Sequence, residues 1–119
     1  MTTYIMKVRE PWFSLIKVGK KKVEGRLNKG LFSKLNIGDI LVFTNNEIEN
    51  LSRECKVKVT NIINYQTFYD YLKTEKLKNC LPGIDNLDDG VSIYSPGFYS
   101  KADEDKFKVL AIKIKRLKN

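Results

Sequence analysis

A short segment between residues 19 and 26 carries side chains of both charges close together: Lys21, Glu24 and Arg26. A carboxylate flanked by two cations stays ionised and holds both of them in place. The cations suit the phosphate or carbonyl oxygens of a ligand, whereas the carboxylate suits an amino group. The segment is therefore the candidate ligand site, with Lys22 as a further basic residue in it.

Alternation along this segment predicts a strand that presents its charges on one face. Val23, Gly25 and Leu27 are expected to face the core. Glu24 and Arg26 then project together from the opposite face, about 7 Å apart along the strand. Because Gly25 has no side chain, it allows close approach of a ligand or of the backbone. The alternative is a solvated strand face, whose ion pairs contribute little to stability.

The residues before this strand predict how Lys21 reaches the site. A short helix is expected from Pro11 to Val18, because proline suits the first helical position. Gly19 fits the left-handed residue that closes such a helix. Lys21 then lies at the turn between helix and strand, where its amine can swing toward the charged face. Trp12, on the helix, is expected to pack on the core.

The rest of the chain predicts a small α+β domain. Five strands with interspersed short helices do not fit a regular parallel array, and they favour a mostly antiparallel β-barrel or strongly curved sheet with flanking helices. The chain, 119 residues without repeats or linkers, is expected to be one domain over 1–119. The expected strands cover 4–9, 22–27, 40–44, 55–60 and 109–115, and the expected helical stretches cover 11–18, 31–35, 67–77 and 84–94.

Composition narrows the chemistry. The sequence contains no histidine, which excludes a Ser-His-Asp or Cys-His nucleophile and any His-ligated metal. Cys55 and Cys80 lack metal-ligand spacing and are expected to be reduced, buried thiols. Acidic residues could hold a hard cation, but they are expected to cap a helix and fill a loop instead; they are Asp85, Asp88, Asp89 and those at 103–105. No metal and no cofactor is predicted.

The charge predicts a polyanionic partner. The net charge is +8 with a pI near 9.5, and Lys56 and Lys58 give one expected strand a basic face. No apolar run approaches the roughly 18 residues of a membrane span, and the N-terminus lacks the features of a signal peptide. A cytoplasmic protein without membrane contact is expected. Tyr94 and Tyr99, beside the turn at 95–97, could stack on a base or close the barrel.

The pattern G-x-K-x-x-E-x-R resembles the signature of the ASCH domain (activating signal cointegrator homology), with Gly19, Lys21, Glu24 and Arg26 at its positions. The surrounding residues agree, and the similarity spans 4–114. The resemblance implies a barrel related to the PUA domains of RNA-modifying proteins, with a cleft lined by the signature residues. It also implies that the ligand is RNA or a nucleotide, so Lys21, Lys22, Glu24, Arg26, Tyr94 and Tyr99 are the expected contacts, shaped by Gly19 and Gly25.

The resemblance also raises the alternative of an enzyme. Some small ASCH proteins are amidohydrolases that act on acetylcytidine, using the motif lysine, a threonine where this chain has Glu24, and a further glutamate. Lys21 is retained, but Glu24 cannot serve as a hydroxyl nucleophile, and Glu75 is the nearest match for the third residue. Another branch resembles metal-dependent ribonucleases. A binding module is expected, with Lys21 and Glu24 as the catalytic residues of any hydrolase, and a protein-interaction module is the further alternative.

Overall fold

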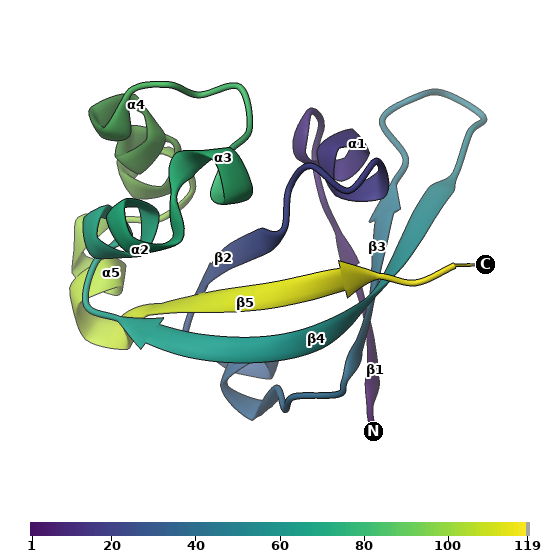
Figure 1. Ribbon diagram of the computed structural model, residues 1–119, viewed down its shortest axis with the longest axis horizontal. Helices are drawn as coiled ribbons and strands as arrows, with labels where there is room; N and C mark the ends of the chain where they lie inside the picture. The colour runs from purple at the N-terminus through teal and green to yellow at the C-terminus, as the bar shows by residue number, and fades with distance from the viewer. Residues whose placement is uncertain (119) are drawn as a thin grey trace.

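The computed structural model describes residues 1–118, and its five strands form one mixed sheet that curls into a half-barrel (Figure 1). The strand order is β1-β3-β4-β5-β2. β1 runs parallel to β3, and the other three neighbouring pairs are antiparallel. β1 and β2 are thus the two edges. The strands are β1 (Thr3–Lys7), β2 (Val23–Leu27), β3 (Ile40–Asn45), β4 (Arg53–Tyr65) and β5 (Val109–Arg116).

Most of the helices gather at one end of the sheet, whereas α1 packs near the other end against β3 and β4 (Figure 1). None of the helices within residues 1–118 is both long and apolar enough to cross a membrane. The helical elements are α1 (Trp12–Lys17), the 3₁₀ helix η1 (Gly30–Lys34), α2 (Phe68–Glu75), α3 (Leu77–Cys80), α4 (Leu87–Ser92), the π-helical turn η2 (Ile93–Phe98) and α5 (Lys101–Phe107).

The predicted fold class is confirmed: the fold is a small α+β structure with a curved, mostly antiparallel sheet and short flanking helices. The expected strand over 55–60 was too short, because β4 continues to Tyr65, which pairs with Val109 of β5. A register shift between Val59 and Asn61 interrupts the alternation there, so periodicity alone ended the strand too early. In addition, β1 and β2 are not paired, so the curl stops short of a closed barrel.

The helices of the second half differ from the predictions at their ends. Thr67 does cap α2, accepting from the Asp70 amide at 3.1 Å, but the helix stops before Lys76, whose φ is +80°. The acidic residues at 103–105 were expected to cap a helix and fill a loop, but they lie within α5 (Lys101–Phe107), so the expected loop is wrong. Ser100 caps α5, and buried Glu104 accepts from the Phe68 amide at 2.7 Å. Only two residues of α5 are apolar, Ala102 and Phe107, so the segment has no apolar periodicity that would predict a helix.

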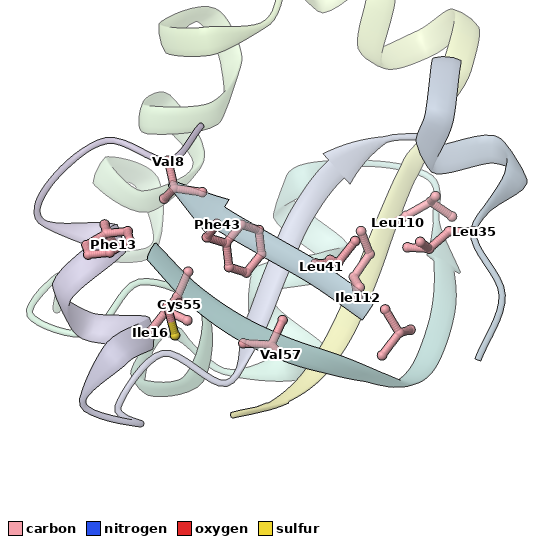
Figure 2. Close-up of a cluster of buried hydrophobic side chains, with 11 residues drawn as sticks. Val8, Phe13, Ile16, Leu35, Leu41, Phe43, Cys55, Val57, Leu110 and Ile112 are labelled. Atoms are coloured by element: carbon pink, nitrogen blue, oxygen red, sulfur yellow. The ribbon is translucent and has the colours of Figure 1, made fainter. Parts of the chain in front are cut away.

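Two hydrophobic clusters form the core. Figure 2 shows the first, in which Phe13 and Ile16 of α1 pack on the inner side chains of β3 and β4. The second lies between the sheet and the helices that follow β4, with Phe68 and Tyr71 of α2 at its centre. Both cysteines are free and buried, as expected, one in each cluster. Trp12 packs against both clusters, at the junction where the candidate site opens.

Candidate functional site

A cavity of about 220 Å³ lies at this junction. β2 supplies its charged wall, α1 and the end of β1 supply another, and η2 closes the far side. Four cations and one carboxylate are among the described lining residues, together with several aromatic rings. The lining residues are Lys7, Val8, Arg9, Trp12, Lys21, Glu24, Gly25, Arg26, Leu81, Ile93, Tyr94, Phe98 and Tyr99.

Lys21 is almost fully buried, with 2% of its surface exposed. Its ammonium donates to the carbonyl of Val23 at 2.8 Å and to the carbonyl of Cys80, and it lies 3.5 Å from Glu24 Oε1. These three acceptors match the three N–H donors of a lysine. Burial lowers the pKa of Lys21 from its ordinary value, although the charge of Glu24 opposes this change. The side chain therefore ties β2 to the end of α3 and supports Glu24.

Glu24 lies between the two cations, as the sequence predicted. Its Oε1 faces Lys21, and its Oε2 accepts from Arg26 Nη2 at 3.2 Å. Burial opposes the charge of this carboxyl, but Lys21 and then Arg26 outweigh burial and lower the pKa of Glu24. Glu24 is thus an ionised, acceptor-only group on the wall of the cavity.

Arg26 is more accessible than its two partners, with 22% of its side chain exposed. Burial alone would lower the pKa of the guanidinium, but the charge of Glu24 raises it above its usual value. The group also stacks over the Phe32 ring, 5.0 Å from its centroid. Its Nη2 donates to Glu24, and the Tyr99 phenol lies close enough for each group to affect the pKa of the other. Because a guanidinium has five N–H donors, it has donors left for a ligand.

The two glycines of the signature have different roles. Gly19 has a φ of +85°, the left-handed conformation predicted for the residue that closes α1. Gly25 is needed because of packing: a Cβ there would lie 2.7–2.8 Å from the Tyr71 ring and hydroxyl. Val23 and Leu27 face the same cluster, as expected. The close approach predicted at Gly25 is therefore made by the side chain of Tyr71.

Tyr94 and Tyr99 line the cavity, and they belong to one aromatic stack. Phe68 lies parallel to both, with ring centroids 4.6 Å from Tyr94 and 5.7 Å from Tyr99. Tyr94 is buried, and its hydroxyl is 3.3 Å from that of Tyr71. Burial raises the pKa of both lining tyrosines, so they present neutral phenols. Tyr94 is a fixed wall, whereas Tyr99 and the exposed Phe98 form the rim.

Several residues considered from the sequence lie elsewhere. Lys22 is exposed and is not among the cavity's lining residues; it borders a separate hollow with Lys115 and Arg116. Glu75 is buried against Tyr65 and Lys113, again outside the cavity.

The acidic residues of the second half do not converge. No three His, Cys, Asp or Glu side chains of residues 1–118 are arranged to hold a metal ion. Asp89 and Asp103 lie in the first turns of α4 and α5, where their amides bond to the capping side chains of Asn86 and Ser100. Helix capping thus accounts for their positions.

Seven lining residues were not predicted as contacts, and four of them bring a charge or an aromatic ring to the cavity: Lys7, Arg9, Trp12 and Phe98. Lys7 and Arg9 are exposed at the mouth, and their place follows from the parallel pairing of β1 with β3, which alternation does not reveal. Trp12 packs on the core as expected, but it also faces the cavity, with Lys21 Nζ 5.9 Å from its ring centroid. Trp12, seven residues before Gly19 of the motif, was the one available signal.

The fold and the charged signature together define a class, and the chain belongs to the ASCH domain family, whose model matches residues 6–118. The crystal structure of the hypothetical protein PH0355 is similar, with a TM-score of 0.85 and 36% identity over 98% of this chain and 100% of that one. The solution structure of protein PF0455 from Pyrococcus furiosus has a TM-score of 0.79 and 33% identity over 98% of this chain and 99% of its own. No curated protein matches the chain.

Proposed function

We propose that this protein binds RNA or a nucleotide, holding one base or nucleoside in the cavity beside Glu24 and Arg26. The observation that supports this most directly is the combination, on one cavity, of a paired carboxylate and guanidinium with aromatic walls. Unstacked RNA bases are bound in this way, by stacking on aromatic rings and by hydrogen bonds to their edges.

The size of the cavity supports a small planar occupant. Its volume of about 220 Å³ is below the range of about 300–1,000 Å³ usual for drug-sized ligands. Trp12, Tyr94 and Tyr99 supply apolar ring surface, on which any base can stack. A single base entering from a flexible strand fits such a site, whereas a rigid duplex does not.

The charges at the mouth support a phosphate-bearing ligand. Lys7 and Arg9 are exposed there, and Arg26 is partly exposed on the wall. The whole chain has a net charge of +8. Contacts between such cations and phosphates are sensitive to salt, so affinity should fall as the salt concentration rises.

Lys21 supports hydrolysis of a modified nucleoside as a second candidate. Its lowered pKa is what a lysine base requires, and it lines the cavity. Against this, its three donors are already directed at Val23, Cys80 and Glu24, and removing a proton would break one of these interactions. Incubation with acetylcytidine tests this candidate, and release of cytidine by the wild type would favour it over binding alone.

The proposed binding is tested by titrating a labelled single-stranded RNA at fixed salt and following fluorescence anisotropy. Arg26→Ala should weaken binding by about tenfold or more, since a base-contacting arginine contributes about 1–3 kcal/mol. Arg116→Ala is the matched control: this arginine is exposed, and it donates to the carbonyl of Lys17 outside the cavity. Equal affinities for Arg26→Ala and the wild type, with an unchanged melting curve, would contradict the proposal.

A further inference from the structure

The outer face of β4 and β5 carries three exposed lysines that do not line the cavity. Lys56 and Lys58 alternate along β4 with residues of the first hydrophobic cluster, so both side chains point away from that cluster. Lys115 of β5 lies directly opposite Lys58 in the antiparallel pairing and is exposed as well. The sequence predicted a basic face on one strand, and the structure adds a third lysine from the end of the chain. Lys56, Lys58 and Lys115 together are the lysine face.

The positive charges of the lysine face are not balanced by neighbouring carboxylates. Within residues 1–118, none of its three lysines forms an ion pair, whereas Lys113, also on β5, pairs with Glu75. Glu54 is exposed on the same side of β4, but it forms no ion pair either. Like charges directly opposite each other destabilise a strand pair. Lys58 and Lys115 are such a pair, and an anionic partner would remove their repulsion.

The acidic residues of the chain are concentrated in another region. Residues 67–107, which contain helices α2 to α5, hold eight acidic and five basic residues, whereas the remainder of the chain holds six acidic and seventeen basic residues. The start of β4 and the end of β5, which carry the lysine face, lie away from these helices (Figure 1). An anion that binds the lysine face therefore does not approach the acidic helices.

The side chains of this face fit a nucleic-acid backbone better than a protein partner. Protein interfaces have an apolar centre. The outward side chains of this stretch of β4 and β5 are all polar: Glu54, Lys56, Lys58, Thr60, Lys113 and Lys115. Residues two apart on a strand are separated by about 7 Å, and neighbouring strands by about 5 Å. These separations are similar to the spacing of successive phosphates along an RNA strand.

We propose that the lysine face binds phosphates of an RNA backbone, as a second contact surface separate from the cavity. Lysine ammonium groups contact phosphates as point charges and do not read the base sequence. The lysine face therefore adds affinity that is independent of sequence and sensitive to salt. This inference rests on the proposed binding of RNA, but it does not depend on what occupies the cavity.

The salt dependence of binding tests the inference. The probe is a labelled single-stranded RNA of about 30 nucleotides, which exceeds the site size of one small domain. Its affinity is measured by fluorescence anisotropy at several salt concentrations. In the triple variant Lys56→Gln, Lys58→Gln and Lys115→Gln, the slope of log affinity against log salt concentration should become shallower by about two, because each phosphate contact on a single strand contributes about 0.7.

The matched control changes three lysines elsewhere. Lys73, Lys78 and Lys101 are exposed on α2, α3 and α5, so changing all three to glutamine lowers the net charge by the same amount. This control should keep the wild-type slope. Equal changes of slope in the two triple variants, or no change in either, would overturn the inference. The lysine-face variant loses a repulsive pair, so its melting temperature should not fall below that of the wild type.

Two further measurements separate the lysine face from the cavity and from another kind of partner. Wild-type affinity in Arg26→Ala, together with a shallower slope in the lysine-face variant, would reject the cavity as the RNA site and support the lysine face. Absence of RNA binding by the wild type would reject both. Polyglutamate that competes as well as RNA at equal concentration of charge would reject an RNA backbone in favour of an acidic protein segment.

Discussion

Glu24 and Glu75 are both nearly inaccessible, 6% and 8% exposed, and each pairs with a lysine, yet their surroundings differ. Glu24 is held by wholly buried Lys21 and by Arg26, and its remaining side opens onto the cavity. Glu75 accepts from the Tyr65 hydroxyl, and Lys113, which covers it, is itself 42% exposed on its side chain.

This difference shows which feature identifies a ligand site. Burial and charge pairing are common to both glutamates, so neither property distinguishes them. What distinguishes Glu24 is an adjacent guanidinium with donors to spare and an open space lined by aromatic rings. Glu75 is not among the described residues that line this cavity, and its carboxylate joins α2 to β4 and β5. Glu75, the nearest match for the third catalytic residue of a hydrolase, therefore lies outside the site that contains Lys21.

The largest effect on stability is expected from removing Lys21 from the charged cluster that it forms with Glu24 and Arg26. Lys21→Ala leaves Glu24 short of one cation and leaves the carbonyls of Val23 and Cys80 without their buried donor. Removing one partner of a buried ion pair costs about 3–5 kcal/mol, so the free energy of unfolding should fall by about that amount. Urea denaturation followed by circular dichroism measures this change.

The matched control for this prediction is the next residue. Lys22 is exposed and outside the cavity, so Lys22→Ala should change the free energy of unfolding by less than about 0.5 kcal/mol. Similar small losses of unfolding free energy in Lys21→Ala and Lys22→Ala would show that the buried contacts of Lys21 contribute little to stability. The surroundings of Glu24 and Glu75 would then not differ in the way described above.

The sequence predicted the half of this cluster that is local. Alternation placed Glu24 and Arg26 on one face of β2, and the left-handed residue after α1 was evident from Gly19. The other half depends on segments far along the chain. The carbonyl that holds Lys21 belongs to Cys80, 59 residues away, and only the folded chain brings it close. For this reason the sequence predicted that the Lys21 amine could swing toward the charged face. In the structure the amine is buried and is held by the carbonyls of Val23 and Cys80 and by Glu24.

The same limit applies to the fold. Helix caps such as Thr67 are local signals and were confirmed, whereas the register shift in β4 and the course of η2 depend on tertiary pairing. The aromatic stack shows this clearly. Tyr94 and Tyr99 were expected near the cleft, but Phe68, which connects them, lies on α2, about thirty residues earlier.

A smaller effect on stability is expected in the second charged cluster, which Glu75 forms with Tyr65 and Lys113. Glu75→Gln keeps the shape of the side chain but replaces the charged acceptor of the Tyr65 hydroxyl and the partner of Lys113. The free energy of unfolding should fall by about 1–2 kcal/mol, the order of one hydrogen bond to a charged group. Affinity for RNA should stay at the wild-type value, because the residue does not line the cavity. Weakened RNA binding in a folded Glu75→Gln protein would show that the two clusters act as one site.

The smallest effect is a pH dependence of stability that comes from Tyr65, in the charged cluster around Glu75. Burial, followed by the hydrogen bond and charge of Glu75, raises the pKa of Tyr65 to about 12, whereas an unfolded tyrosine titrates near 10. Because the folded pKa is the higher one, the stabilisation is complete below pH 10 and is lost as the pH rises toward 12. Tyr65→Phe lacks this hydroxyl, so the wild type should be more stable than the variant by about 1 kcal/mol at pH 8.

That advantage should shrink between pH 10 and pH 12, as the phenol that donates to Glu75 loses its proton. Denaturant midpoints of both proteins at pH 8, 9, 10 and 11 measure the difference, and the other tyrosines cancel because both proteins carry them. Tyr69→Phe, at a position that is 43% exposed, is the control. A difference that stays constant across this range would mean that Tyr65 does not donate to the carboxylate. Glu75 would then be a buried anion held by Lys113 alone, and the contrast with the doubly paired Glu24 would be larger than the contacts of the two clusters imply.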